Sequence, residues 1–413
     1  MEKSSAEYES YLSQVRLLLE ELCCDLCRFE HVRQDGLAPE SIRIDRECSL
    51  GQPGAFADIR VLAPNHAAYF VEVKHGYSNQ ALIKHLRRKY GLDTAALKQA
   101  AKVVLVVDTE GRPDWQAVQS DLPQCLRPGL KLEIWDEERL LSLLFQVFGI
   151  RIKAITPDRL LDVRQAIDQA KGYHAFGGPS LAEYHHDPLR AELIWHFGFW
   201  RLGQLREGRH LTPREVFPPG LYRGVAVLLA DLCSFSSYVR DTREDEVVRH
   251  CLTSFYSKAR YQILNNGGMF YQFVGDEVIG LFGIPDRQPG CVQHALETAR
   301  TLVDIGNSVS NHWQRHIDRV QESGGMHIGM ALGDLQIVSL RPFSRTHMGA
   351  IGDTINVAAR LTACAGPSEI VVSNSFYYEL EEAAQAGFQE TEPLQARNVG
   401  RIKAWKLNLR KES

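Results

Sequence analysis

The sequence predicts a mixed α/β protein, of the α+β kind, in which two domains are joined by a helical connector. The first observation is length, because 413 residues are too many for a single hydrophobic core. The second is texture: strand-like and helix-like patterns alternate near both ends of the chain, whereas the middle carries helical patterns alone. We therefore expect an N-terminal α/β domain over residues 1–154, a helical connector over 155–218 and a C-terminal domain over 219–413.

The composition predicts a soluble, cytoplasmic protein. Apolar residues make up 44% of the chain, and the net charge of -4 gives no overall attraction to nucleic acid or to an anionic membrane. No apolar run approaches the ~18 residues that span a bilayer. The chain begins with an amphipathic, acid-containing helix pattern, unlike a secretory signal. The nine cysteines are scattered, and no second Cys or His pair follows the cluster Cys23, Cys24 and Cys27, so we expect reduced thiols.

The N-terminal domain is expected to continue from this helix into strands that carry a candidate site. The strand patterns lie at 41–45, 56–63, 67–74, 102–108 and 131–136. Period-two alternation places Glu72 and Lys74 on one face of their strand, with Asp58 on the neighbouring strand. This D…E-x-K pattern, and the order of a helix followed by strands, resemble the PD-(D/E)xK nucleases, whose acids bind a metal ion that polarises water.

Two interpretations of this domain stay open. In a live nuclease, the basic stretch KHLRRKYG at 84–91 would contact phosphate. Alternatively, Glu72 and Lys74 form an ordinary charge pair, and the basic stretch is a solvated helix face. We favour a disabled nuclease fold that is kept for sensing or for dimerisation.

The connector is expected to hold helices at 157–170 and 189–205. Gly-Gly-Pro at 177–179 and Pro-Pro-Gly at 218–220 interrupt these patterns, because both residue types break regular structure.

The C-terminal domain shows the order β-α-β-β-α-β. Its first strand, GVAVLLADL, is a nearly continuous apolar run that ends in an acid, as expected of a buried central strand. The elements that follow are a helix at 245–264, a hairpin that turns at Gly275 and Asp276, a helix at 291–313 and a strand at 326–340. This order predicts a ferredoxin-like domain.

The ferredoxin-like order brings two distant acids together. The first and third strands are central, adjacent and antiparallel in that topology, so Asp231 at the end of the first lies beside Asp276 at the start of the third. Taken singly, the acids have ordinary explanations as a strand terminator and a turn residue. Together they suit Mg²⁺ or Mn²⁺, and two such ions ~4 Å apart can clamp the attacking and leaving oxygens of a phosphoryl displacement.

Phosphoryl transfer also needs positive charge and hydrogen-bond donors near the phosphates. Asn356 and Arg360 stand four residues apart on one face of a helix that begins near Thr354. Asn356 can then hold a ribose and Arg360 can reach phosphates, although such pairs are also common on solvated helices. Lys403, expected on a strand near the C-terminus, offers a second cation.

Four stretches resemble the class III nucleotidyl cyclases, the catalytic domains of adenylyl and guanylyl cyclases. They are LLADLCSFSSY, FVGDEVIGLFG, IGDTINVAARL and GRIKAW, in that order. The resemblance implies that Asp231, Asp276 and the backbone carbonyl of Leu232 bind two Mn²⁺ or Mg²⁺ ions in each active site.

The same resemblance assigns the cationic residues and the assembly. It implies that Asn356 and Arg360 stabilise the transition state and that Lys403 binds phosphate. It also implies a symmetric homodimer in which the metal-binding acids of one protomer face these three residues of the other.

The residues expected to read the base depart from the adenylyl pattern. Adenylyl cyclases of this class usually have lysine four residues before the second metal-binding acid, and aspartate or threonine three residues before the glycine of the IGD turn. Here Gln272 and Gly349 occupy these positions, with Tyr271 and His347 flanking them to narrow the pocket. Because a glutamine amide both donates and accepts, it can pair with uracil, cytosine or guanine, and adenine is disfavoured.

The whole chain resembles the pyrimidine cyclases of Pycsar anti-phage defence, which make cyclic UMP or cyclic CMP as a signal for a separate effector. The resemblance favours UTP as the nucleoside triphosphate substrate. The alternatives are a cytidylate or guanylate cyclase, a nuclease or nucleic-acid sensor whose C-terminal domain is only a scaffold, and a diguanylate cyclase. VGDEV resembles the Gly-Gly-Asp-Glu-Phe turn of diguanylate cyclases, but INVAAR and GRIKAW have no counterpart expected there.

Overall fold

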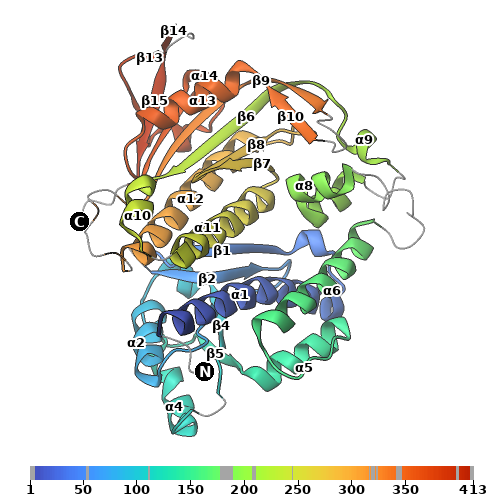
Figure 1. Cartoon of the computed structure of the whole chain (residues 1–413), viewed down its shortest axis with the longest axis vertical. Coiled ribbons are helices and arrows are strands. Elements are labelled where there is room, and N and C mark those ends of the chain that lie inside the picture. The colour runs from blue at the N-terminus through green and yellow to red at the C-terminus, as the bar shows by residue number, and fades with distance from the viewer. Residues whose placement is uncertain are drawn as a thin grey trace. The chain divides into compact units, whose positions relative to one another are not determined.

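The chain divides into two compact units, Met1–Gly172 and Tyr173–Ser413 (Figure 1). The computed structural model describes residues 5–52, 55–109, 112–176, 189–206, 211–243, 245–315, 317, 321, 324–340, 347–396 and 400–409. The predicted break at 177–179 lies outside these residues. None of the described helices combines the length and the apolar character that crossing a membrane requires. All nine cysteines are free, and only Cys364 is exposed.

The first unit contains a mixed sheet in the order β1-β2-β3-β4-β5. The first three strands pair antiparallel, and β4 and β5 continue the sheet in parallel. The strands are β1 (Arg43–Ser49), β2 (Phe56–Leu62), β3 (Ala68–Val73), β4 (Ala100–Val106) and β5 (Lys131–Trp135). This sheet confirms the predicted α/β domain.

The helices of the first unit pack against this sheet and against one another. α1 (Ser5–Asp35) contacts β2, β3 and α5 (Glu137–Phe148), while α2 (Asn79–Tyr90) buries its apolar side chains in a separate core cluster. The remaining elements are η1 (Pro39–Ser41), α3 (Ala95–Lys98), α4 (Trp115–Asp121), η2 (Leu122–Cys125) and α6 (Pro157–Phe176). Lys171 of α6 pairs with Asp25 of α1 at 2.7 Å, so the first helix of the predicted connector belongs to this unit.

The second unit is built on the strand order β9-β6-β8-β7. Numbered from β6, this is 4-1-3-2, the order of a ferredoxin-like domain, as the sequence predicts. Its elements are β6 (Gly220–Leu232), α11 (Asp245–Asn265), β7 (Met269–Val274), β8 (Glu277–Phe282), α12 (Cys291–Gln314) and β9 (Met326–Leu340).

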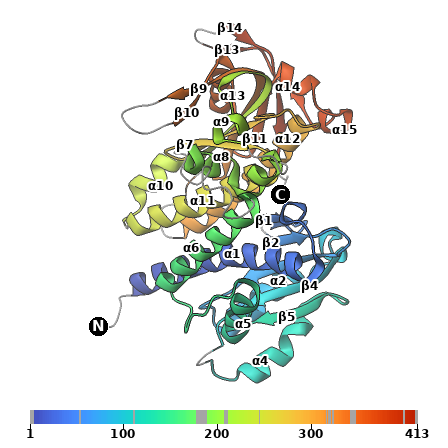
Figure 2. The same cartoon turned by 90° about the vertical axis from the view of Figure 1, so that its right-hand side faces the viewer.

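Further elements extend this core. β11 (Glu369–Ser373), β15 (Ala404–Asn408) and β12 (Gln389–Glu390) add to the sheet beyond β9, and β10 (His347–Ile351) pairs with the end of β9 (Figure 2). β13 (Leu394–Ala396) and β14 (Gly400–Ile402) form a separate pair. The helices are α8 (Leu189–Arg206), α9 (Pro213–Val216), α10 (Phe235–Asp241), α13 (Asp353–Cys364), α14 (Asn374–Tyr378) and α15 (Glu382–Gln385).

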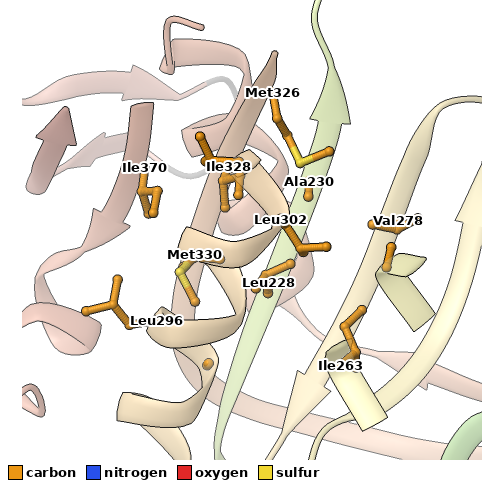
Figure 3. Packing of buried hydrophobic residues seen from close by; sticks show 14 of the residues in the cluster. Leu228, Ala230, Ile263, Val278, Leu296, Leu302, Met326, Ile328, Met330 and Ile370 are labelled. Atoms are coloured by element: carbon orange, nitrogen blue, oxygen red, sulfur yellow. The ribbon is translucent and has the colours of Figure 1, made fainter. Parts of the chain in front are cut away.

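Helices cover both faces of the large sheet. Leu228 and Ala230 of β6 belong to the core shared with α11 and α12, where Ile263 and Leu302 pack beside them (Figure 3). The alternate residues of β6 belong to a second core, shared with α8 and α13. Asp231 continues the alternate series, so its side chain lies on the face that carries α8 and α13.

A glycine lets α13 lie directly on the sheet. A Cβ atom at Gly329 of β9 would stand 2.2 Å from the backbone nitrogen of Thr362 and 2.3 Å from the carbonyl oxygen of Ala358, both in α13. Any side chain at residue 329 would therefore push α13 away from β9. This close packing positions the helix that carries Asn356 and Arg360.

Candidate active site

The hairpin turn between β7 and β8 holds Asp276 at the edge of the sheet. Gly275 and Asp276 are the only residues between Val274 and Glu277, which pair with each other. The backbone φ angle is 62° at Gly275 and is not positive at Asp276. These angles match a type II′ turn in which glycine is the first of the two central residues. The hydroxyl of Tyr256, in α11, donates to the carbonyl of Gly275 and so secures the turn.

Asp231 and Asp276 meet at this edge. Asp231 is in register with Glu277 of β8, and the carboxyl groups of Asp231 and Asp276 are within hydrogen-bonding reach of each other. Burial, together with the neighbouring Asp231 carboxylate, raises the pKa of Asp276 to about 7. Burial and the same carboxylate also raise the pKa of Glu277. The fold thus concentrates three acids that are costly to ionise together.

This donor set fits a divalent metal ion. A cation between Asp231 and Asp276 would offset their mutual repulsion, and carboxylate oxygens are hard ligands that prefer Mg²⁺ or Mn²⁺. Leu232 ends β6, is buried and pairs with Met326 of β9. Sequence reasoning missed Glu277, although its position directly after the Gly-Asp turn and opposite Asp231 follows from the predicted hairpin register.

Asn356 and Arg360 lie on one exposed face of α13. Lys403 is also exposed, but it is not on a strand as predicted: it lies between β14 and β15, where its carbonyl accepts a hydrogen bond from the backbone N–H of Asn374. Within the described ranges of one chain, no hydrogen bond or ion pair joins these three side chains to Asp231 or Asp276. A single chain therefore presents the acids and the cations as separate groups.

The two strands expected to read the base are connected by Tyr271. Gln272 is half-buried on β7 and Gly349 is buried on β10. A β-bulge at Tyr271 interrupts the pairing of β7 with β8, and the Tyr271 hydroxyl accepts a hydrogen bond of 2.9 Å from the backbone N–H of Ala350. Tyr271 is 8% exposed, so it joins β7 to β10 next to Gln272 and Gly349.

Helix α8 adds a partly buried polar cluster of Glu192, His196 and His347 beside these strands, and sequence reasoning missed Glu192 and His196. His347 of β10 donates through Nδ1 to Glu192 at 2.8 Å, and His196 donates through Nδ1 to the carbonyl of Phe270 at 2.8 Å. Burial lowers the pKa of His196, whose ring stacks on Tyr271 with centroids 6.4 Å apart. The available signal was the spacing of Glu192 and His196, which puts both on one helix face.

The predicted acids of the N-terminal unit also meet, together with lysines. Asp58 and Glu72 face each other across β2 and β3, and Lys74 lies 3.0 Å from Asp58 and 2.8 Å from Glu72. Lys89 of α2 forms a further ion pair with Glu72 and lies 3.8 Å from Asp58, while the Tyr90 hydroxyl donates to Glu72 at 2.7 Å.

The negative charges of Asp58 and Glu72 are balanced by the lysines of the same cluster. Burial by itself would lower the pKa of Lys74, but the carboxylates of Asp58 and Glu72 outweigh burial and raise it. Lys74 is therefore held as a cation against the oxygens that a catalytic metal would need, and Lys89 pairs with Glu72 as well. A metal ion would compete with both lysines there. Lys89 is an inward-facing member of the predicted basic stretch, and its exposed neighbours include Arg87 and Arg88.

The charge around this cluster predicts a pH dependence of stability. Burial and the nearby charges of Lys74, Lys89 and Arg88 lower the pKa of His85 from 6.5 to about 4. Between about pH 6.5 and pH 4, His85 binds a proton in the unfolded chain but not in the folded chain. The free energy of unfolding therefore decreases as the pH falls through this range. We expect His85→Gln to flatten the pH dependence of urea unfolding in this range, whereas His312→Gln in the second unit should not. Equal slopes for His85→Gln and the wild-type protein would contradict this account.

Comparisons with known proteins agree with the C-terminal assignment. Residues 218–408, just under half of the chain, match the family model described as Adenylate and Guanylate cyclase catalytic domain. An uncharacterized protein of Mycobacterium tuberculosis is 28% identical over 157 residues, which are 38% of this chain and 26% of that protein. The matched region therefore spans about a quarter of the length of such curated relatives.

Solved structures with a similar fold include two cyclases. The guanylate cyclase domain of RhGC from Catenaria anguillulae, solved with GTP, is 19% identical, has a TM-score of 0.39 and covers 46% of this chain and 99% of its own. The adenylyl cyclase CyaB from P. aeruginosa is 16% identical, has a TM-score of 0.40 and covers 46% of this chain and 95% of its own.

Proposed function

We propose that this chain, whose residues 218–408 form an adenylate and guanylate cyclase catalytic domain, converts UTP to cyclic UMP and diphosphate. The observation that carries the proposal is the contact between Asp231 and Asp276 at the edge of a 4-1-3-2 sheet. The nucleotide cyclase domain is supported by the family match, whereas the base preference is proposed from Gln272 and Gly349 and the biological role from the resemblance to anti-phage cyclases.

The proposed reaction is an intramolecular phosphoryl transfer. The ribose 3′-oxygen bonds to the α-phosphorus, the bond from that phosphorus to the bridging oxygen of the β-phosphate breaks, and the 3′-hydroxyl proton leaves to solvent. Divalent cations at Asp231 and Asp276, which class III cyclases generally require, would neutralise the triphosphate and favour ionisation of the 3′-hydroxyl. We propose Mn²⁺ or Mg²⁺, two in each site.

The remaining residues are assigned to binding and charge stabilisation. Asn356 would orient the ribose, Arg360 would donate to the charge that develops on the α-phosphate, and Lys403 would bind the departing diphosphate. All three are exposed and have no partner among the described residues, which leaves their polar groups available to a ligand.

The active unit is proposed to be a homodimer with composite sites. The support is an apolar surface next to both halves of the site: Phe273 and Val274, just before the acid turn, are 42% and 60% exposed, and Ile351, just before α13, is 59% exposed. A second copy of the chain would cover these side chains and bring Asn356 and Arg360 of one protomer to the acids of the other.

The base preference predicts a substrate ranking. The amide of Gln272 can pair with the polar edge of uracil, whereas adenine would leave the donor and acceptor of this amide mismatched. A substrate that leaves polar groups of its pocket unpaired is disfavoured by factors up to ~10⁴. Incubation of the purified chain with Mn²⁺ and each of the four NTPs, with products identified by mass, is expected to show cyclic UMP as the main product, with CTP or GTP as the next best substrate. Gln272→Ala should reduce UTP turnover more than residual ATP turnover. Cyclic AMP as the main product would contradict the base assignment while leaving the cyclase assignment intact.

The polar cluster of Glu192, His196 and His347 lies beside the strands that carry Gln272 and Gly349. We therefore expect Glu192 to influence the selectivity for the base by positioning these strands. Glu192→Gln keeps the size of the side chain but removes the negative charge that orders His347. The contact between α8 and Tyr271 should also become less well ordered. We expect a ~3–10-fold loss of UTP selectivity over CTP, mainly in KM, since a hydrogen bond to a charged group is worth ~1.5–3 kcal/mol when buried and less here, where the His347 side chain is 43% exposed. Glu133→Gln, which loses the ion pair with Lys102 in the first unit, is the control. If Glu192→Gln has the same selectivity as the wild-type protein, Glu192 does not contribute to base selection.

The biological role is proposed from the resemblance to anti-phage cyclases. Cyclic UMP would act in the cytoplasm as a signal that a separate cyclic-nucleotide effector reads. The N-terminal unit, with its acids neutralised by Lys74 and Lys89, is assigned to sensing or dimerisation in preference to cleavage of nucleic acid.

A further inference from the structure

A second group of metal-ligating side chains lies in the first unit, far in sequence from Asp231 and Asp276. His31 and Asp35 are in the last turn of α1, and His66 is in the turn between β2 and β3. One ligand atom from each lies within 4.8 Å of the other two. The group is partly exposed, so an ion from solution can reach it.

Both imidazole rings are directed at one carboxylate oxygen. Oδ2 of Asp35 lies 2.7 Å from Nδ1 of His31 and 3.3 Å from Nε2 of His66. The two rings meet edge to face, with centroids 4.9 Å apart. If both were protonated, two imidazolium rings would stand side by side against a single negative charge.

The other nitrogen of His31 has its own partner. Nε2 lies 3.3 Å from the hydroxyl oxygen of Tyr69, and this hydroxyl also hydrogen-bonds to the buried thiol of Cys27. If the tyrosine proton is directed to the sulfur, its oxygen accepts the Nε2–H of His31. Nδ1 of His31, which faces Asp35, is then the nitrogen that would bind a metal ion.

We propose that His31, Asp35 and His66 bind one divalent transition-metal ion, with zinc as the best fit. Two imidazoles and a carboxylate are a common zinc ligand set, and bonds of ~2.0–2.2 Å in a tetrahedral arrangement separate the ligand atoms by about 3.3 Å. The 3.3 Å separation between Oδ2 of Asp35 and Nε2 of His66 matches that spacing, whereas the 2.7 Å separation between Oδ2 and Nδ1 of His31 would have to widen when an ion binds. Tyr69 supplies the outer hydrogen bond that orients a metal-bound histidine.

The site would connect two segments that are distant in the chain. An ion bound there ties the C-terminal end of α1 to the β2–β3 turn, and so stabilises the first unit. Its nitrogen ligands select zinc, cobalt or nickel, whereas the oxygen ligands at Asp231 and Asp276 select magnesium or manganese. The two sites are therefore separable by the metal that each prefers.

The experiment uses the full chain with Asp231→Asn and Asp276→Asn, so that the acid site does not bind the probe. Calorimetric titration with Zn²⁺ is expected to show one equivalent bound, and Co²⁺ should give the visible absorption of a site with nitrogen ligands. His66→Ala, at an exposed turn, should weaken zinc binding at least ~10-fold, and Asp35→Asn should do the same. Zinc should also raise the thermal unfolding midpoint of the parent chain but not that of the His66 variant.

The matched control is a pair of histidines in the second unit. His250 and His312 have ring centroids 5.8 Å apart, and replacing both by alanine should leave the zinc equivalent intact. The proposal is overturned if the parent chain binds no zinc equivalent, if His66→Ala and Asp35→Asn bind zinc as tightly as the parent does, or if the His250 and His312 variant loses it instead. The first result would mean that the three side chains only hydrogen-bond to one another.

Discussion

Replacing Asp276 by alanine is expected to lower the rate of cyclic nucleotide formation at least ~100-fold. Asp276 lies beside Asp231 at the edge of the sheet, and burial together with the neighbouring Asp231 carboxylate raises the pKa of Asp276 to about 7. Removing one of them removes the cation that offsets the charge of the triphosphate. A group of this kind is commonly worth ~3–4 kcal/mol in the transition state, which corresponds to a factor of at least ~100. Asp231→Ala should have a similar effect, measured as turnover with saturating Mn²⁺ and UTP.

A matched control separates this effect from a general loss of negative charge. Glu382, an exposed acid in the first turn of α15, can be replaced by glutamine and should leave turnover unchanged. The thermal unfolding of each variant shows whether it is folded. Near-normal turnover in Asp231→Ala or Asp276→Ala would contradict the metal assignment, whichever base the enzyme prefers.

Mixing two inactive variants is expected to restore activity. Asp276→Ala damages the acid half of the site and Arg360→Ala damages the cationic half, so each homodimer lacks a complete site. After subunit exchange, one of the two sites in every heterodimer carries neither change, and random pairing then gives about a quarter of the wild-type rate. The measurement is turnover of each variant alone and of the equal mixture, at a total protein concentration that supports dimers.

The control for complementation is a mixture that cannot restore a site. Asp231→Ala mixed with Asp276→Ala places both changes in the same half, so every site remains damaged and turnover should stay at the level of the single variants. Exchange is verified with subunits that carry different fluorescent labels. If subunits exchange but the mixture of Asp276→Ala and Arg360→Ala does not regain activity, each chain must hold a whole site. That result would contradict the proposed dimer with shared sites.

Local sequence patterns were enough to predict the core of the second unit. The apolar run that ends at Asp231 and the Gly275-Asp276 turn are short-range signals, because burial and turn geometry restrict the residues that can occupy them. Once the β-α-β-β-α-β order is recognised, only one common arrangement places the first and third strands side by side. The structure puts Asp231 in register with Glu277, the residue directly after Asp276, as expected of two acids at neighbouring strand ends. These predictions needed no knowledge of side-chain contacts.

Contacts between distant segments were beyond the reach of the sequence. The predicted connector gave no sign that its first helix, α6, would join the first unit through Lys171 and Asp25, while α8 would pack in the second. An amphipathic helix buries its apolar face against any complementary surface, so its pattern does not identify the surface. The same reason explains why Glu192 went unnoticed beside the strands that carry Gln272 and Gly349.

The N-terminal site shows the division most clearly. Period-two alternation by itself determined that Asp58, Glu72 and Lys74 lie together, because strand pairing and side-chain direction follow from local backbone geometry. Only the tertiary structure decided that Lys89 of α2 turns inward to pair with Glu72, since a lysine on a helix can equally face water. That one orientation converts a candidate metal site into a neutralised cluster. No lysine or arginine among the described residues pairs with Asp231 or Asp276 at the edge of the C-terminal sheet, which is why we propose the catalytic metal site there and not at Asp58 and Glu72.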